Sequence, residues 1–214
     1  SAGNRAILAI DVEGSIWRAG LVDVAEGRRQ ARRIFEGHRW RMAFETWGIG
    51  VGIDRAGALW YWHDDEVERA LGGPGAAADD TLLHALEPGT AFIDACLQGT
   101  RLHAINARGR MLRSLSLQRT LTDPDASLQG ERSTLDALDA DAPLVRLACR
   151  ENASHVMALD GRGRIWGYGI DTFGELGAGA NAGHEGREAL AATTLRLLSE
   201  RNWLDLAVGP SVTL

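Results

Sequence analysis

The chain has 214 residues, of which 45% are hydrophobic, and its 26 glycines and 5 prolines are typical of one soluble all-β domain. Its 23 basic residues are all arginine and are outnumbered by 29 acidic residues, and the resulting net charge of -6 argues against a nucleic-acid-binding surface. The sequence contains no apolar run long enough to cross a membrane, and without lysine it cannot use Schiff-base or Walker-type phosphate chemistry.

Four β-hairpins are predicted from one pattern that recurs along the chain. The pattern is a small residue, an aliphatic residue, Asp or Asn, two variable positions, Gly, one variable position and two bulky apolar residues, and it occupies residues 9–17, 52–60, 104–112 and 158–166. Asp or Asn opens a tight turn, and Gly supplies the positive φ angle that closes it. The aligned glycines lie roughly 43 to 54 residues apart, the length of a propeller blade, and they are Gly14, Gly57, Gly109 and Gly163.

Two further strands are predicted for each repeat. One strand runs ahead of a hairpin and contains a small residue near its end, at residues 40–44, 92–96 and 145–149, and residues 204–208 have the same form. The other is a short apolar strand at residues 31–35, 82–86, 134–138 and 194–198. Four strands per repeat make one propeller blade. We therefore expect an all-β fold, a β-propeller of four-stranded blades with about four blades, in a single domain over residues 1–214.

The two ends of the chain are complementary in this pattern, because the first hairpin has no preceding strand and the last such strand has no hairpin. In many propellers a terminal strand completes the blade at the other end, which leaves no open sheet edge. Three arrangements satisfy that requirement: a closed four-bladed ring, a half-ring that self-associates to complete a ring, and a portion of a larger propeller.

The longest connections lie at residues 63–80, 113–132 and 170–192. The first contains a short helix at residues 65–71 ahead of a Gly-Pro break. Propeller loops emerge from rigid blades and carry the variable chemistry, so a partner is expected on these loops and the rim.

The fourth repeat resembles the regulator-of-chromosome-condensation repeat, a β-propeller family. Its sequence HVMALDGRGRIWGYGIDTFGELGAG spans residues 155–179 and has the family's His-x-x-Ala-Leu strand, turn, aromatic strand ending in Trp-Gly-x-Gly, and Gly-x-Leu-Gly tail. The other three repeats keep the hairpin and lose the glycine-rich tail, and the third has Leu112 in place of the tryptophan. The resemblance implies a propeller fold, for which the family usually uses seven blades, and a structural role for His155.

The resemblance also implies a binding scaffold. Relatives include a nucleotide-exchange factor for a small GTPase, substrate-recruiting parts of ubiquitin ligases and a bacterial inhibitor that caps β-lactamases. The exchange activity is not carried over, because the chain has no counterpart of the exchange-promoting insertion.

Chemistry-bearing residues do not form a recognisable catalytic constellation, so no catalytic residue, cofactor or metal ligand is assigned. Acidic turn residues beside a histidine, as in His63, Asp64 and Asp65, are more often solvated than metal-ligating. Cys96 and Cys149 occupy equivalent positions in consecutive repeats. Reduced core cysteines are the favoured interpretation, and a bridge between blades is the alternative.

Five of the seven tryptophans are assigned to packing. Trp17, Trp60 and Trp166 share one repeat position, and Trp40 and Trp203 lie near the start of the strand that runs ahead of a hairpin. The aromatic residues outside that register, with the polar residues that follow them, are the partner-binding candidates: Trp47, Tyr61, Trp62, His63, Asp64, Asp65 and Tyr168.

The sequence therefore predicts a non-catalytic protein-binding propeller, an inhibitor or immunity-type partner of another protein, with no nucleic-acid or membrane partner. The alternatives are a carbohydrate-binding propeller lectin and a propeller-type lyase. The absence of a signal-peptide pattern at residues 1–10 slightly favours the cytoplasm.

Overall fold

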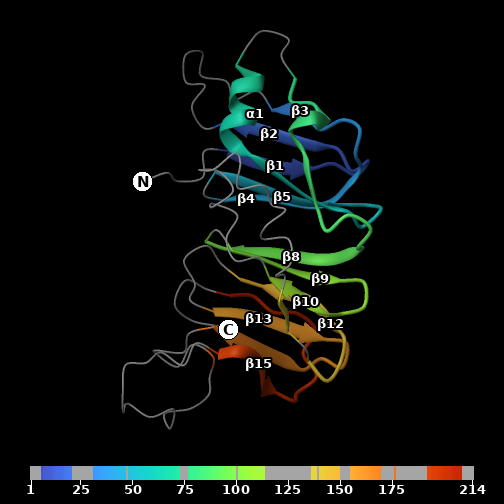
Figure 1. Cartoon of the computed structure of the whole chain (residues 1–214), viewed down its shortest axis with the longest axis vertical. Coiled ribbons are helices and arrows are strands. Elements are labelled where there is room, and N and C mark those ends of the chain that lie inside the picture. The colour runs from blue at the N-terminus through green and yellow to red at the C-terminus, as the bar shows by residue number, and fades with distance from the viewer. Residues whose placement is uncertain are drawn as a thin grey trace. The chain divides into compact units, whose positions relative to one another are not determined.

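The computed structural model describes residues 6–20, 31–46, 48–72, 77–99, 101–113, 136–138, 140–149, 155–169, 176 and 192–208 (Figure 1). These residues divide into an N-terminal unit, Ser1–Phe92, and a C-terminal unit, Ile93–Leu214. Each unit consists of antiparallel sheets whose strands follow one another in chain order.

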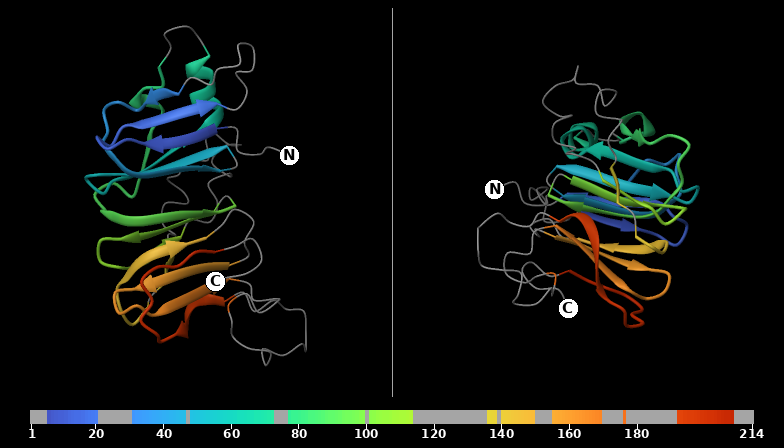
Figure 2. Two further views of the ribbon diagram at one scale, coloured as in Figure 1. Left: turned by 180° about the vertical axis from the view of Figure 1, so that it is seen from behind. Right: turned by 60° about the horizontal axis from the view of Figure 1, so that its bottom comes forward.

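The N-terminal unit contains blades 1 and 2. Blade 1 is a three-stranded sheet of β1 (Ala6–Ile10), β2 (Ile16–Gly20) and β3 (Arg32–Ile34). Blade 2 is a four-stranded sheet of β4 (Trp40–Thr46), β5 (Ile49–Asp54), β6 (Leu59–His63) and β7 (His84–Leu86). Between β6 and β7 the chain forms the helix α1 (Asp64–Leu71) and a short 3-10 helix η1 (Asp80–Leu82), so the predicted helix in this connection is confirmed. The alternating strand directions are visible from behind (Figure 2).

Blades 3 and 4 make up the C-terminal unit, with the first strand of blade 3 beginning at the unit boundary. Blade 3 contains β8 (Phe92–Gln98), β9 (Arg101–Asn106), β10 (Met111–Arg113) and β11 (Asp136–Leu138). Blade 4 contains β12 (Leu144–Ala148), β13 (His155–Asp160), β14 (Ile165–Gly169) and β15 (Ala192–Ser199). The prediction of an all-β propeller with about four blades is confirmed.

All four predicted hairpins form in the predicted register. The residues that close the turns pair as Ile10 with Ile16, Ile53 with Leu59, Ile105 with Met111 and Leu159 with Ile165. The four aligned glycines have φ angles of 87°, 88°, 77° and 76°, in the left-handed region that favours glycine. Each turn therefore depends on its glycine as the pattern predicted.

A side-chain clamp closes three of the four turns. In the first hairpin, Asp11 Oδ1 accepts the backbone N–H groups of Glu13 and Ser15, and Asp11 Oδ2 accepts the indole N–H of Trp17 at 2.8 Å. Asp54 with Trp60 and Asp160 with Trp166 repeat the indole bond at 3.0 and 2.9 Å. The tryptophans at this repeat position thus fasten the turn to the strand that follows it.

The glycine carbonyl of each turn also accepts a backbone N–H from a segment further along the chain. The carbonyl of Gly14 accepts the N–H of Trp40 at 2.7 Å, and Gly57 accepts from Phe92 at 2.8 Å. Gly109 and Gly163 do the same for Leu144 at 2.9 Å and Trp203 at 2.8 Å. One turn geometry therefore sets both the hairpin and its attachment.

Buried apolar side chains form a core within each unit. In the N-terminal unit the core includes Ile16, Ile34, Trp40 and Trp62, and Val67 joins it from α1. In the C-terminal unit it includes residues from blades 3 and 4, among them Ile105, Met111, Leu144, Val156 and Trp166.

The favoured interpretation of the two cysteines was wrong. Cys96 in β8 and Cys149, directly after β12, are joined in a disulfide with their Cα atoms 5.9 Å apart. The two residues occupy equivalent positions in adjacent blades and pack against the core of the C-terminal unit, so the alternative of a bridge between blades is confirmed.

The predicted strand at residues 204–208 does not form as a strand. Only Val208 makes an isolated bridge, and the side chain of Leu204 is 96% exposed. This segment is instead attached through the bond between Trp203 and Gly163.

Replacing Gly163 with alanine is expected to destabilise the fold by roughly 1–3 kcal/mol, because the residue has a positive φ. A Cβ atom there would also lie 2.9 Å from the carbonyl oxygen of Trp203. Urea unfolding measures the effect. Gly161→Ala is the matched control, since its Cβ would meet nothing closer than 3.8 Å. Equal stability of the two variants would contradict the turn assignment.

Removing the disulfide with Cys149→Ala is expected to lower the free energy of unfolding by roughly 2–4 kcal/mol, because the bond closes a loop over a sequence separation of 53. Reductant should bring the wild-type protein toward the stability of the variant and leave the variant unchanged. Two titratable thiols per chain after oxidising purification would show that the bond does not form.

Candidate functional site

The candidate site lies where β6 passes into α1. His63 ends the strand and is the N-cap residue of the helix, and Asp64, Asp65 and Glu66 form the acidic first turn. Carboxylates are favoured there because the helix N-terminus carries a partial positive charge. Val67 is fully buried in the core of the unit. The helix is therefore held against blade 2 with its acidic turn beside the end of β6.

A buried arginine organises the base of this helix. The side chain of Arg18, on β2, contacts carboxylates of Glu45, Asp64 and Glu68. Its Nε lies 3.3 Å from Glu45, and its Nη1 lies 2.7 Å from Glu68. The indole of Trp62 also donates to Glu45 at 2.8 Å. One guanidinium thus ties blade 1, blade 2 and α1 together.

Burial and neighbouring charges shift the pKa values of Glu45 and Arg18 in opposite directions. Burial raises the pKa of Glu45, although Arg18 and the Trp62 indole act to lower it. Burial alone would lower the pKa of Arg18, but Glu45, Glu68 and Asp64 raise it above the ordinary arginine value. The carboxylates therefore stabilise the guanidinium, and Glu45 is the most buried of the three, with its side chain 7% exposed.

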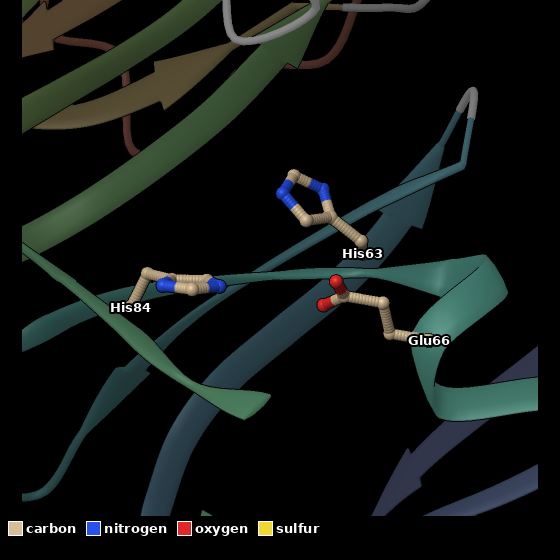
Figure 3. Close-up of side chains that lie close together, drawn as sticks. All are labelled: His63, Glu66 and His84. Carbon is tan, nitrogen blue, oxygen red and sulfur yellow. The ribbon is translucent and has the colours of Figure 1, made fainter. Parts of the chain in front are cut away.

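A second cluster lies next to this network and consists of His63, Glu66 and His84. Their side chains converge from β6, α1 and β7 (Figure 3), and one potential ligand atom from each lies within 4.8 Å of the others. The ring of Tyr61 stacks on His84 with centroids 4.8 Å apart. Burial and His84 lower the pKa of His63, whereas Glu66 and Asp65 act to raise it. This imidazole is therefore neutral near pH 7.

The aromatic partner-binding candidates occupy different environments. Tyr61 and Trp62 are buried in blade 2, where Trp62 packs against Phe35 and Trp40. Tyr168 is buried in the core of the C-terminal unit, where the guanidinium of Arg113 donates to its hydroxyl. Trp47 lies outside the described residues.

The polar candidates lie together at the end of β6. His63 is largely buried, Asp64 is partly buried and engages Arg18, and Asp65 is exposed and pairs with Arg69. Sequence reasoning thus located this segment but missed Arg18, Glu66 and His84. The spacing His63-x-x-Glu66 was a local signal, since it places both residues at one helix start. Nothing local marks His84, which strand pairing brings opposite Tyr61.

Two further histidines are buried in the C-terminal unit. His155 starts β13 and is buried in the blade, where the resemblance placed a structural histidine. His103 lies 3.3 Å from the side-chain oxygen of Gln98, and burial, with Arg113 and Arg101, lowers its pKa to about 3. It is a neutral core residue.

The C-terminal unit exposes apolar and basic residues at its turns. The turns are linked in series, because Gly109 accepts from Leu144, Gly161 donates to Pro143, and Gly163 accepts from Trp203. Exposed side chains along this series define what we call the turn surface: Arg108, Arg162, Trp203 and Leu204. Tryptophan and arginine are residue types enriched at binding hot spots.

Comparisons with known proteins place the fold. No protein family and no curated protein sequence matches the chain. The structure of human WBSCR16 matches 99% of the chain with a TM-score of 0.63 at 14% identity. Yeast RCC1 (Prp20), solved with Kap60 bound, matches 93% with a TM-score of 0.58 at 15% identity. A structure of Prp20p from Saccharomyces cerevisiae matches 96% with a TM-score of 0.59 at 15% identity.

The chain spans about half the length of these solved structures, covering 55%, 48% and 51% of theirs. At these identities the likeness concerns the fold. The protein has a divergent propeller fold of the RCC1 type. Within the described part of the chain, no helix is long and apolar enough to span a membrane.

Replacing Arg18 with methionine is expected to destabilise the protein by roughly 3–5 kcal/mol, because it leaves buried carboxylates without their cation. Arg69→Met is the matched control: its ion pair with Asp65 has side chains 73% and 69% exposed, and its loss should cost less than about 1 kcal/mol. Chemical denaturation compares the two. An equally small decrease in the free energy of unfolding of both variants would contradict the organising role of Arg18.

Proposed function

We propose that the protein is a non-catalytic scaffold that binds another protein. The observation that carries this proposal is the RCC1-type propeller fold combined with an exposed turn surface in the C-terminal unit. Two of the similar structures concern protein partners of yeast Prp20: Kap60 in one, and Gsp1p and histones in the other. Those partners belong to Prp20, and the class of partner is what we transfer to this chain.

The turn surface has the composition that a protein interface needs. Leu204 and Trp203 are 96% and 42% exposed, and Arg108 and Arg162 are exposed on the neighbouring turns. Aromatic residues and arginines are enriched at interfaces, where aromatic side chains exclude water and arginines pair with acidic groups. A partner with an acidic rim around an apolar pocket fits this surface.

The rigidity of the turns supports the same role. The clamp of Asp160 and Trp166 and the bond from Trp203 to Gly163 fix the backbone that presents the anchors. A rigid surface loses less conformational freedom on binding. Such a surface suits an inhibitor or immunity-type protein that caps a partner, and this is the role that we propose within the class of protein-binding scaffolds.

The expected result is that the purified chain captures one protein from native-source lysate at a fixed stoichiometry, and that Trp203→Ala weakens its binding. Removal of a tryptophan hot spot should reduce the affinity roughly thirtyfold, as measured with the recombinant partner.

Leu204→Asp and Val12→Asp form a matched pair, because both side chains are 96% exposed but Val12 lies in the first hairpin of the N-terminal unit. Leu204→Asp should abolish capture and Val12→Asp should preserve it. If all three variants captured the same proteins, the interface would lie elsewhere on the chain. If no fraction of the lysate yielded a protein bound at a fixed stoichiometry, the scaffold proposal would be overturned.

A further inference from the structure

Two imidazoles and one carboxylate converge at the end of β6, and the strand and helix geometry brings them together. His63 is the last residue of β6, and Glu66 lies in the first turn of α1. His84 is paired with Tyr61 in the adjacent strand, so it lies on the diagonal from His63. We propose that His63, Glu66 and His84 bind a divalent transition-metal ion, with Zn²⁺ as the favoured ion.

The donor set determines the class of ion. Two histidine nitrogens and one carboxylate oxygen form a common three-residue set for Zn²⁺, and a fourth position stays open for water or another ligand. Mg²⁺ and Ca²⁺ prefer oxygen ligands throughout. The set therefore favours zinc over the hard cations.

Two independent observations show that the donors are available. The Nδ1 atom of His63 is buried and has no hydrogen-bond partner among the described residues. Within the same part of the chain, no arginine or histidine forms an ion pair with Glu66. A buried polar atom without a partner is rare in folded proteins. A metal ion bound through Nδ1 would supply the partner that this atom lacks.

To bind a zinc ion, the three ligand atoms need to move only slightly closer together. The three candidate ligand atoms lie within 4.8 Å of one another, whereas donors of a tetrahedral zinc site lie roughly 3.4 Å apart. Glu66 and His84 are both partly exposed, so rotations of their side chains can close this difference. The rings of His63 and His84 and the carboxylate of Glu66 lie close together (Figure 3), and the ring of Tyr61 stacks on that of His84.

The surrounding charges also accommodate a cation. The start of a helix repels positive charge, but Asp64, Asp65 and Glu66 place three carboxylates in the first turn of α1. The nearby guanidinium of Arg18 is engaged by Glu45, Asp64 and Glu68. This site is independent of the turn surface, so either proposal can fail without the other.

Isothermal titration with Zn²⁺ tests the site on the full chain, prepared without a histidine tag and treated with chelator. The wild-type protein is expected to bind one ion per chain. Glu66→Gln and His84→Gln should each weaken binding at least about tenfold. Asp65→Asn is the matched control: it removes a neighbouring carboxylate outside the cluster and should change the affinity less than about twofold.

Co²⁺ provides a second measurement, since intense visible absorption indicates tetrahedral coordination and should be lost in His84→Gln. Circular dichroism establishes that each variant is folded, and both substituted ligand residues are partly exposed, which favours folded variants. Absence of Zn²⁺ binding at micromolar concentration, or equal affinity in the wild type and in the folded Glu66→Gln and His84→Gln variants, would overturn the proposal.

Discussion

The constraint on which this structure depends is the hairpin turn with Asp or Asn at its start and glycine at its end. The carboxylate of Asp160 accepts the N–H groups of Arg162 and Arg164 through one oxygen and the indole of Trp166 through the other. The positive φ of Gly163 then directs its carbonyl to Trp203. Strand pairing, packing of the tryptophan and attachment of the following segment all follow from one five-residue turn.

The third repeat departs from this pattern in a way that the chemistry explains. Asn106 still accepts two backbone N–H groups through Oδ1. Its other side-chain atom is an amide nitrogen, a donor, which cannot accept an indole N–H as a carboxylate oxygen does. The repeat with Asn accordingly has Leu112 where the others have tryptophan. In the sequence, Asn106 in place of Asp and Leu112 in place of Trp are two separate differences from the repeat. The missing hydrogen bond between carboxylate and indole explains why they occur together.

Local signals predicted the turns, most strands and the helix, because each depends on residues that are close in sequence. The disulfide and the partners of Arg18 could not be predicted in this way, since blade packing brings together residues far apart in the chain. The repeat did contain a signal for the disulfide: Cys96 and Cys149 are equivalent in adjacent blades.

The connection between β6 and β7 departs most from a plain blade, and one of its two clusters positions the other. Arg18 binds Asp64 and Glu68 on α1, while Val67 fixes the helix in the core. Ion pairs at this depth gain little net stability over apolar packing, because desolvation opposes the attraction. Their consequence is positional: they hold the first turn of α1 against β6, and this sets Glu66 beside His63. The network of Arg18 therefore accounts for the geometry of the histidine cluster without taking part in its chemistry.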